Sequence, residues 1–172
     1  MSVHEELEEH AHHAHEPFDK IVAASMAIIA AALAVVSMFA QHYNTETVLN
    51  QQLAADQWAY YQAKDIRRYV AQSTRDTLLA LKGDPAQAAN YLDESVKYRK
   101  QADEIQEKAR KYEEERVVNG RLALRFDFGE VFLEIGIVFA SLAILTKRRA
   151  FFALGILSAI AGALFAVTAH WL

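Results

Sequence analysis

The amino-terminal residues of this chain are rich in histidine and glutamate. Five of its seven histidines precede residue 16, and residues 8–16 read EEHAHHAHE. On a helix, His12 and His15 are three residues apart and Glu8 and His12 are four apart, so each pair shares a face and can chelate one divalent ion. Imidazole with carboxylate suits Zn, Ni, Cu or Co better than Ca. The candidate metal ligands are His10, His12, His13 and His15.

Two other interpretations of this run stay open. It lacks a spacing that is specific to any known metal site, and a soluble acidic tail or short helix before a membrane would look the same. A pH-responsive surface is the third alternative, because imidazole changes its charge between about pH 5 and 8. The sequence therefore requires no cofactor, and a divalent transition metal at the amino terminus remains one of three hypotheses.

A second set of chemically capable residues lies further along the chain. Asp127, Glu130 and Glu134 have the spacing i, i+3, i+7, which puts them on one helical face. Glu134 falls inside an apolar run, where a carboxylate costs a few kcal/mol unless it is protonated, paired or hydrated, so we expect it to face other helices. His42 and His170 follow two other apolar runs on the same side. The four residues Glu130, Glu134, His42 and His170 predict an intramembrane polar cluster that binds a cation, passes protons or locks helices together.

Three apolar runs must position these residues. Residues 21–40 and 150–169 carry no charge, and 131–146 carry only Glu134. About twenty apolar residues span a bilayer core, so the chain is predicted to be an all-α integral membrane protein with three transmembrane helices. The acidic start and the length of the first run argue against a cleaved signal peptide. The expected segments are a His-rich tail (1–17), spans at 18–41, 128–146 and 150–171, a polar segment (42–127) and a basic turn (147–149).

The polar segment is predicted to be a long antiparallel helical hairpin. It has as many basic as acidic side chains and one strong break, residues 82–85 (KGDP). Gly83 suits a left-handed residue that ends a helix, Asp84 suits the N-cap of the next helix, and Pro85 suits its first turn. Each arm has about forty residues, which corresponds to a length on the order of 60 Å.

Apolar and small residues at alternating spacings of three and four predict a coiled-coil-like seam on each arm. The returning arm offers Tyr98, Ala102, Ile105, Ala109 and Tyr112, and the outgoing arm offers Ala59, Ala63, Ile66, Val70 and Ser73. The arms hold more apolar side chains than one partner helix can cover, so the hairpin is expected to pack on copies of itself or on a partner complex. The residues expected to carry packing are Trp58, Tyr61, Ile66, Tyr98, Ile105 and Tyr112, with Gly155 and Gly162 in the third span. Small residues there allow close helix contact, and either packing within the chain or oligomerisation would use them.

Basic residues give the expected orientation. Lys147, Arg148 and Arg149 join the second and third spans, and basic residues in short loops stay cytoplasmic. This places the amino terminus inside and puts the hairpin and the carboxyl terminus outside the cytoplasmic membrane. Arg121 and Arg125 oppose this orientation, but charges beside long polar segments count less.

The stretch from Asp56 to Lys64, DQWAYYQAK, is similar to a motif of a known family. The order of an acidic His-rich start, an Ala-rich span ending in a His, this motif and a last pair of spans joined by a basic turn matches as well. The chain resembles a bacterial family of three-span membrane proteins that is catalogued as a domain of unknown function. The resemblance implies a membrane location and a bacterial source. It supplies no activity, substrate or catalytic residue.

No nucleophile–base pair, glycine-rich phosphate loop or metal-hydrolase motif appears in the sequence, so we expect no enzyme, no catalytic residue and no small-molecule substrate. A neutral hairpin outside the cytoplasm is also unsuited to nucleic acid. We expect a structural or accessory protein of the bacterial inner membrane, in contact with lipid, that forms a homo-oligomer or joins a larger membrane complex. The alternative is an oligomeric ion channel or a metal- or pH-responsive protein that uses Glu130, Glu134 and the His-rich amino terminus.

Overall fold

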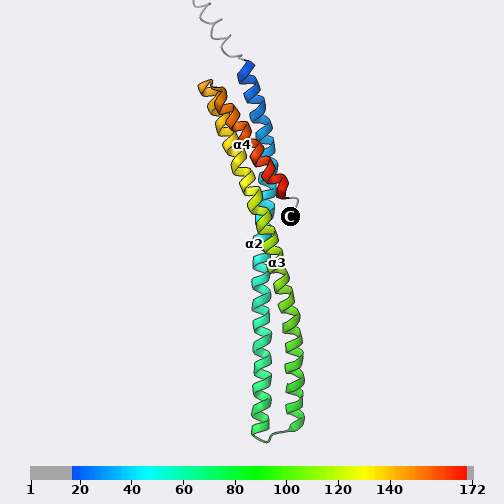
Figure 1. Cartoon of the computed structure of the whole chain (residues 1–172). Coiled ribbons are helices and arrows are strands. Elements are labelled where there is room, and N and C mark those ends of the chain that lie inside the picture. The colour runs from blue at the N-terminus through cyan, green and yellow to red at the C-terminus, as the bar shows by residue number, and fades with distance from the viewer. Residues whose placement is uncertain (1–16, 170–172) are drawn as a thin grey trace, which may run out of the picture. The chain divides into compact units, whose positions relative to one another are not determined.

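The computed structural model describes residues 17–169, which form three helices: α2 (Pro17–Ala80), α3 (Pro85–Thr146) and α4 (Arg149–Thr168) (Figure 1). The prediction of an all-α fold is confirmed, because these residues contain helices and turns but no strand. The length of α2 and α3 follows from composition, since the described part of the chain holds few residues that break a helix. The predicted ligands His10, His12, His13 and His15, and also His170, lie outside the described residues.

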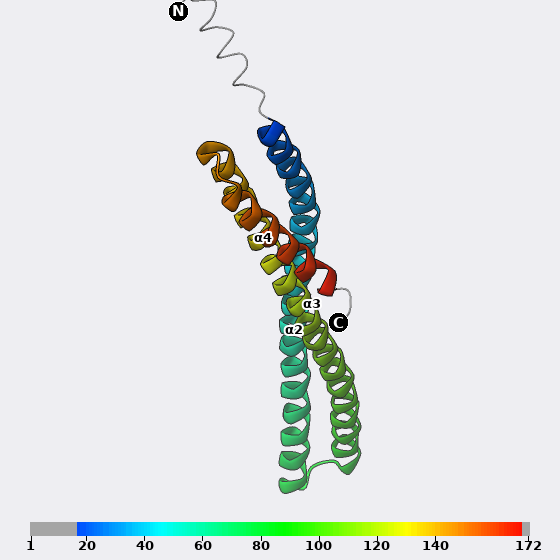
Figure 2. The same ribbon diagram turned by 45° about the horizontal axis from the view of Figure 1, so that its top comes forward.

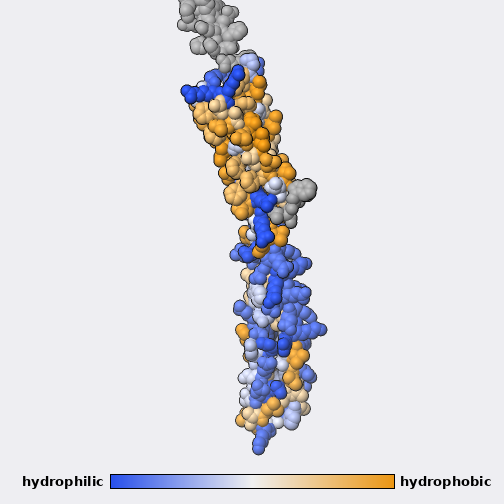
Figure 3. All heavy atoms as spheres, viewed as in Figure 1, coloured by the Kyte–Doolittle hydropathy of each residue, from blue (hydrophilic) through white to orange (hydrophobic). Residues whose placement is uncertain are grey.

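The described residues form two compact units, to each of which α2 and α3 contribute. Residues up to Asn44 and from Arg121 onwards form the first, which we call the apolar unit, and Thr45–Gly120 form the second, the hairpin unit. The sequence had placed these boundaries at 41/42 and 127/128. Apolar residues cover the visible surface of the apolar unit, whereas the hairpin unit is mainly polar with scattered apolar patches (Figure 3). All three helices are long and apolar enough to cross a membrane.

The turn of the hairpin unit differs from the prediction in one respect. Lys82, and not Gly83, takes the left-handed conformation, with φ 52°. The N–H of Gly83 donates to the carbonyl of Leu78 and the N–H of Lys82 to that of Leu79, which is the Schellman arrangement with Lys82 at its left-handed position. Gly83 lies close to the end of α2, because a Cβ there would be 3.2 Å from the carbonyl oxygen of Leu78, which is a tight contact.

The next helix begins as the sequence predicted. The carboxylate of Asp84 accepts a hydrogen bond from the N–H of Ala86 (2.9 Å), and its carbonyl accepts one from Ala88. This is an N-cap, and Pro85 follows it at the first helical position, where a missing N–H costs nothing. The second turn is shorter than expected: α3 ends at Thr146 and α4 begins at Arg149, with Lys147 left-handed at φ 55°.

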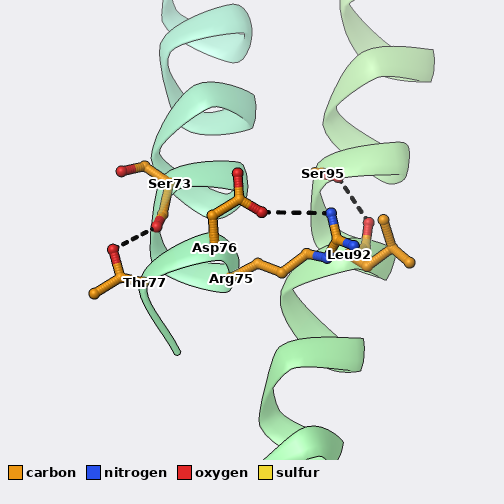
Figure 4. A network of polar contacts seen from close by, with 6 residues as sticks. All are labelled: Ser73, Arg75, Asp76, Thr77, Leu92 and Ser95. Carbon is orange, nitrogen blue, oxygen red and sulfur yellow. Dashed lines mark hydrogen bonds and ion pairs between the residues drawn. The ribbon is translucent and has the colours of Figure 1, made fainter. Parts of the chain in front are cut away.

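The two arms of the hairpin unit pack through a seam of small residues. On α3 the buried residues recur every seven positions, at Ala88, Ser95, Ala102 and Ala109, with Ile105 between them. Ser95 is buried as a polar residue, and its hydroxyl donates to the carbonyl of Leu92 (2.8 Å), so its hydrogen-bonding capacity is satisfied within α3 (Figure 4). Small side chains that recur every seven residues let the backbones of the two arms approach closely.

The seam on α2 lies on a different face from the one that the sequence predicted. Ala59, Ala63, Ile66, Val70 and Ser73 are all exposed, and the buried residues of this arm are Asn50, Ala54 and Ala71. Gln57, Tyr61, Lys64 and Arg68 lie half-buried between them. The predicted stripe fitted the spacing of a coiled coil, but α3 packs against the more polar face of α2.

Candidate functional site: polar and helix-contact residues

The carboxylates of the predicted polar cluster have separate partners. The hydroxyl of Ser37 on α2 donates to Glu130 on α3 (2.5 Å), and the side-chain amide of Asn44 donates to Asp127 (3.1 Å). Both bonds join α2 to α3 within the apolar unit. Each bond gives a carboxylate of α3 a donor on α2, so Asp127 and Glu130 contribute hydrogen bonds between the two helices.

The structure does not bring the predicted cluster together within the described residues. His42 is exposed, and its ring contacts that of Tyr43 at a centroid distance of 5.2 Å. In residues 17–169, no group of three or more His, Asp or Glu side chains is close enough to hold a metal ion. The described carboxylates that have partners therefore form hydrogen bonds between helices and no metal site.

Glu134 is the exception among these carboxylates. We expected it to face other helices, but it is exposed on α3 and has no hydrogen-bond or ion-pair partner among the described residues. Its neighbours one turn away, Val131 and Val138, are exposed as well. An unpaired carboxylate therefore lies on the outside of a helix segment that is otherwise apolar.

Polar contacts fasten both ends of the apolar unit. The ammonium of Lys147 pairs with Asp19, and the rings of Phe18 and Phe152 meet edge to face at 5.9 Å, so the start of α2 lies beside the turn between α3 and α4. At the other end the guanidinium of Arg125 donates to the carbonyl of Thr168 (2.9 Å), where a cation satisfies the last carbonyls of α4.

Two glycine pairs bring α3 and α4 into backbone contact. A Cβ on Gly162 would lie 2.7 Å from the carbonyl oxygen of Gly129, and one on Gly155 would lie 2.9 Å from that of Gly136. The hydroxyl of Ser158 also donates across this contact to the carbonyl of Phe132 (2.7 Å). Gly155 and Gly162 therefore pack within the chain in this structure. Figures 1 and 2 show α3 and α4 running side by side.

Gly129 and Gly136 were missed by the sequence analysis. Their signal was present, because they are seven residues apart, as Gly155 and Gly162 are. When each of two antiparallel helices carries two glycines seven residues apart, both glycines of one helix can lie opposite glycines of the other. The equal spacing on the two helices therefore predicts the contact better than the glycines of one helix alone.

The other α2–α3 contacts of the apolar unit are apolar and aromatic. Leu133 is fully buried and packs with Ile29 and Val36 of α2. The ring of Phe126 stacks on those of Phe39 and Tyr43 at centroid distances of 5.4 and 5.5 Å. These contacts leave the Glu134 side of α3 uncovered.

The predicted packing residues of the hairpin unit divide into two groups. Ile105 is buried between the arms, and Trp58, Tyr61, Tyr98 and Tyr112 are half-buried there. The indole N–H of Trp58 donates to Glu113 on the opposite arm (2.9 Å). Ile66 differs from the others, since 63% of it is exposed. Five of the six residues are therefore buried or half-buried, and only Ile66 is exposed.

Comparison with known proteins adds a family and no activity. No curated protein and no solved structure matches this chain. The family model described as a domain of unknown function, DUF4337, matches residues 18–172, which include all the contacts described above. The resemblance to an uncharacterised family is thereby confirmed, and this chain belongs to the DUF4337 family.

Proposed function

We propose that this chain is a non-enzymatic, membrane-anchored assembly protein whose helical hairpin docks a further helix, from another copy or from a partner membrane complex. The observation that carries the proposal is the outer face of α2 in the hairpin unit. Its residues Ala59, Ala63, Ile66, Val70 and Ser73 alternate at spacings of four and three, which is the pattern of a coiled-coil seam, and every one is exposed. We call this stripe the outer seam.

The outer seam is available to a partner because α3 packs against the opposite, inner face of α2. α3 takes the face with Asn50, Ala54 and Ala71, so the hairpin is held together without the outer seam. Ser73 accepts a bond from Thr77 through its carbonyl (2.8 Å), and neither of their side chains crosses to α3 (Figure 4). Ile66 and Val70 present large apolar surfaces at the centre of the stripe. An exposed apolar stripe with coiled-coil spacing is typical of a helix-docking surface.

The proposed location is the bacterial inner membrane, crossed three times. Support comes from the three apolar helices and from the contact of Asp19 with Lys147, which puts the amino-terminal end of α2 beside the basic turn. By the positive-inside rule, Lys147, Arg148 and Arg149 keep that end of the apolar unit in the cytoplasm. The hairpin unit and the carboxyl terminus then lie in the periplasm.

The test is a pair of matched substitutions in the full chain. Ile66→Glu puts a charge at the centre of the outer seam, and Val96→Glu puts the same charge on an equally exposed residue of α3, 60% against 63%. Native mass spectrometry of protein extracted gently from its own membrane should show a complex for the wild type and for Val96→Glu. With Ile66→Glu the complex should lose the subunits that the outer seam holds, so its mass should fall. An Ile66→Glu variant that keeps the wild-type complex contradicts the proposal.

A second candidate function is ion conduction by an oligomer. The observation that favours it is Glu134, an exposed carboxylate without a partner in an apolar segment, since such residues often mark ion or proton pathways. This function predicts ion flux in liposomes that contain the wild-type protein and loss of that flux with Glu134→Gln. Liposomes that show no wild-type flux exclude it.

A further inference from the structure

One face of α3 in the apolar unit repeats the geometry of a helix-contact seam. Val131, Glu134, Val138, Ser141 and Leu145 follow one another at spacings of three and four, and all five are exposed. Apolar and polar residues alternate along the stripe: Val131, Val138 and Leu145 are apolar, and Glu134 and Ser141 lie between them. We call the positions of Glu134 and Ser141 the polar layers. Leu145 is 80% exposed. We call this stripe the α3 stripe.

Neither of the other helices covers the α3 stripe. α4 contacts the side of α3 that carries Gly129 and Gly136, and α2 takes the side that carries Glu130 and Leu133. Both of these sides have partners at close range, and the α3 stripe is what remains. An occupant must therefore come from outside the described part of this chain.

A neighbouring stripe on α2 leaves room for that occupant. Ala23, Ala27, Ala30 and Ala34 follow at spacings of four and three, and all are exposed. The two stripes lie on neighbouring faces of the two helices. Ser37 is one turn beyond Ala34, Glu130 is one turn before Glu134, and a hydrogen bond joins Ser37 to Glu130. A helix resting on the α3 stripe would meet the methyl groups of these alanines on the α2 side, and such small side chains allow a close approach.

We propose that the α3 stripe is covered by the α3 stripe of a second copy of this chain, running parallel and in register. The inference rests on the membrane placement in the proposed function, because two copies inserted in one membrane have the same orientation and the same depth. In lipid an unpaired carboxylate or hydroxyl is unfavourable, whereas valine and leucine are indifferent to lipid or protein. The polar layers therefore select the partner.

A second copy complements these layers one by one. In the parallel, in-register pair each polar layer meets its own equivalent: the carboxyl of Glu134 meets the partner's Glu134, and the hydroxyl of Ser141 meets the partner's Ser141. Two carboxyl groups that share one proton form a hydrogen bond, with the protonated oxygen donating to the other carboxyl. A shift by one layer would put Glu134 against valine, so the polar layers also fix the register. The contact is isologous, since the same face is used on both copies.

The absence of cysteine from the chain permits a direct test by single-cysteine crosslinking in membranes. Val138→Cys puts a thiol in the α3 stripe, and Leu154→Cys puts one on the exposed side of α4, at 58% and 47% exposure in the wild type. Mild oxidation of the full-length protein in native membranes should give a disulfide-linked dimer for Val138→Cys and none for Leu154→Cys. Equal crosslinking of both, or none at Val138→Cys, overturns the inference.

Substitutions at Glu134 test the polar layer in the same assay. Glu134→Gln keeps a side chain that donates and accepts, so the Val138→Cys dimer should stay within about threefold of its wild-type yield. Glu134→Leu removes both the contact and the cost of facing lipid, so the yield should fall by about tenfold or more. A Glu134→Leu yield equal to that of Glu134→Gln contradicts a role for the carboxyl group in pairing.

The outcomes separate this inference from the proposed function. A fall in the mass of the native complex with Ile66→Glu, without a Val138→Cys dimer, leaves the outer seam standing and removes the α3 pairing. A Val138→Cys dimer together with an Ile66→Glu variant that behaves as wild type removes the docking role of the hairpin and leaves the α3 pairing standing.

Discussion

At the scale of single residues, the absence of a Cβ from four glycines allows α3 and α4 to pack closely in the apolar unit. Gly162 and Gly129 bring two backbones together at a distance that leaves no space for a Cβ, as do Gly155 and Gly136. In the proposed membrane location lipid would supply no hydrophobic force between helices, so α4 is expected to be held by close packing and by the hydrogen bonds from Ser158 and Arg125.

The glycine contact gives the first prediction. Gly162→Ala puts a Cβ 2.7 Å from the carbonyl oxygen of Gly129 and 3.1 Å from the amide nitrogen of Leu133, both of which are backbone atoms. We expect a loss of about 1–3 kcal/mol of stability through overpacking. Thermal unfolding in detergent measures it.

Gly120→Ala is the matched control. A Cβ there would meet only the side chain of Thr47 at 3.7 Å, which is an ordinary contact. Because glycine weakens a helix interior, this variant should be neutral or more stable by up to about 1 kcal/mol. Equal destabilisation by the two substitutions would contradict the account of the glycine contact.

At the scale of the elements, spacing alone chose the wrong face of α2. The stripe through Ile66 and Val70 has the apolar content of a seam, and the true inner face carries Asn50, Gln57, Lys64 and Arg68. The choice depends on what α3 offers in return, which α2 does not encode: the ammonium of Lys64 lies over the ring of Tyr98 on α3. Within α2, Lys64 also lies over the ring of Tyr60, and Arg68 pairs with Asp65 (2.7 Å). The long aliphatic stems of Lys64 and Arg68 allow both residues to lie half-buried at this face.

On α3 and in the apolar segments the sequence predicted more. The seam with Ala102, Ile105 and Ala109 is buried as expected, because small residues alternate there with larger ones at coiled-coil spacing. The three apolar helices and the N-cap at Asp84 also follow from local patterns. The partners of Glu130 and Asp127 were not predictable, since Ser37 and Asn44 are ordinary residues until α2 and α3 are placed side by side.

The two faces of the hairpin unit give the second prediction. Ala102 is 3% exposed at the inner seam, whereas Ala63 is exposed on the outer seam. Ala102→Leu should destabilise the hairpin by about 1–3 kcal/mol through overpacking. Ala63→Leu should change stability by less than about 0.5 kcal/mol. Urea unfolding of the full-length protein in detergent, followed by circular dichroism, distinguishes them. A greater loss of stability with Ala63→Leu than with Ala102→Leu would indicate that α3 packs against the face of α2 that the sequence first predicted.

At the scale of the whole molecule, the proposed orientation rests on the basic turn between α3 and α4. The turn with Lys147, Arg148 and Arg149 should lie in the cytoplasm and the hairpin unit in the periplasm. Single cysteines test this third prediction against a cysteine-free background: Asn90→Cys in the hairpin unit and Thr146→Cys beside the basic turn, both at exposed positions.

A membrane-impermeant maleimide added to spheroplasts should label Asn90→Cys at once, and Thr146→Cys only after the cells are opened. The reverse pattern would invert the orientation. It would leave the docking proposal standing, with the partner then expected in the cytoplasm.

The central claim is that another helix covers the outer seam of α2, and site-specific photo-crosslinking in living cells tests it most directly. A photoreactive amino acid is placed at Ile66 in one strain and at Val96 in another, two positions of nearly equal exposure. The account predicts a discrete crosslinked product at Ile66 and none at Val96, and the mass of the product tells a second copy from a foreign subunit. No product at Ile66, or the same diffuse products at both positions, would contradict it.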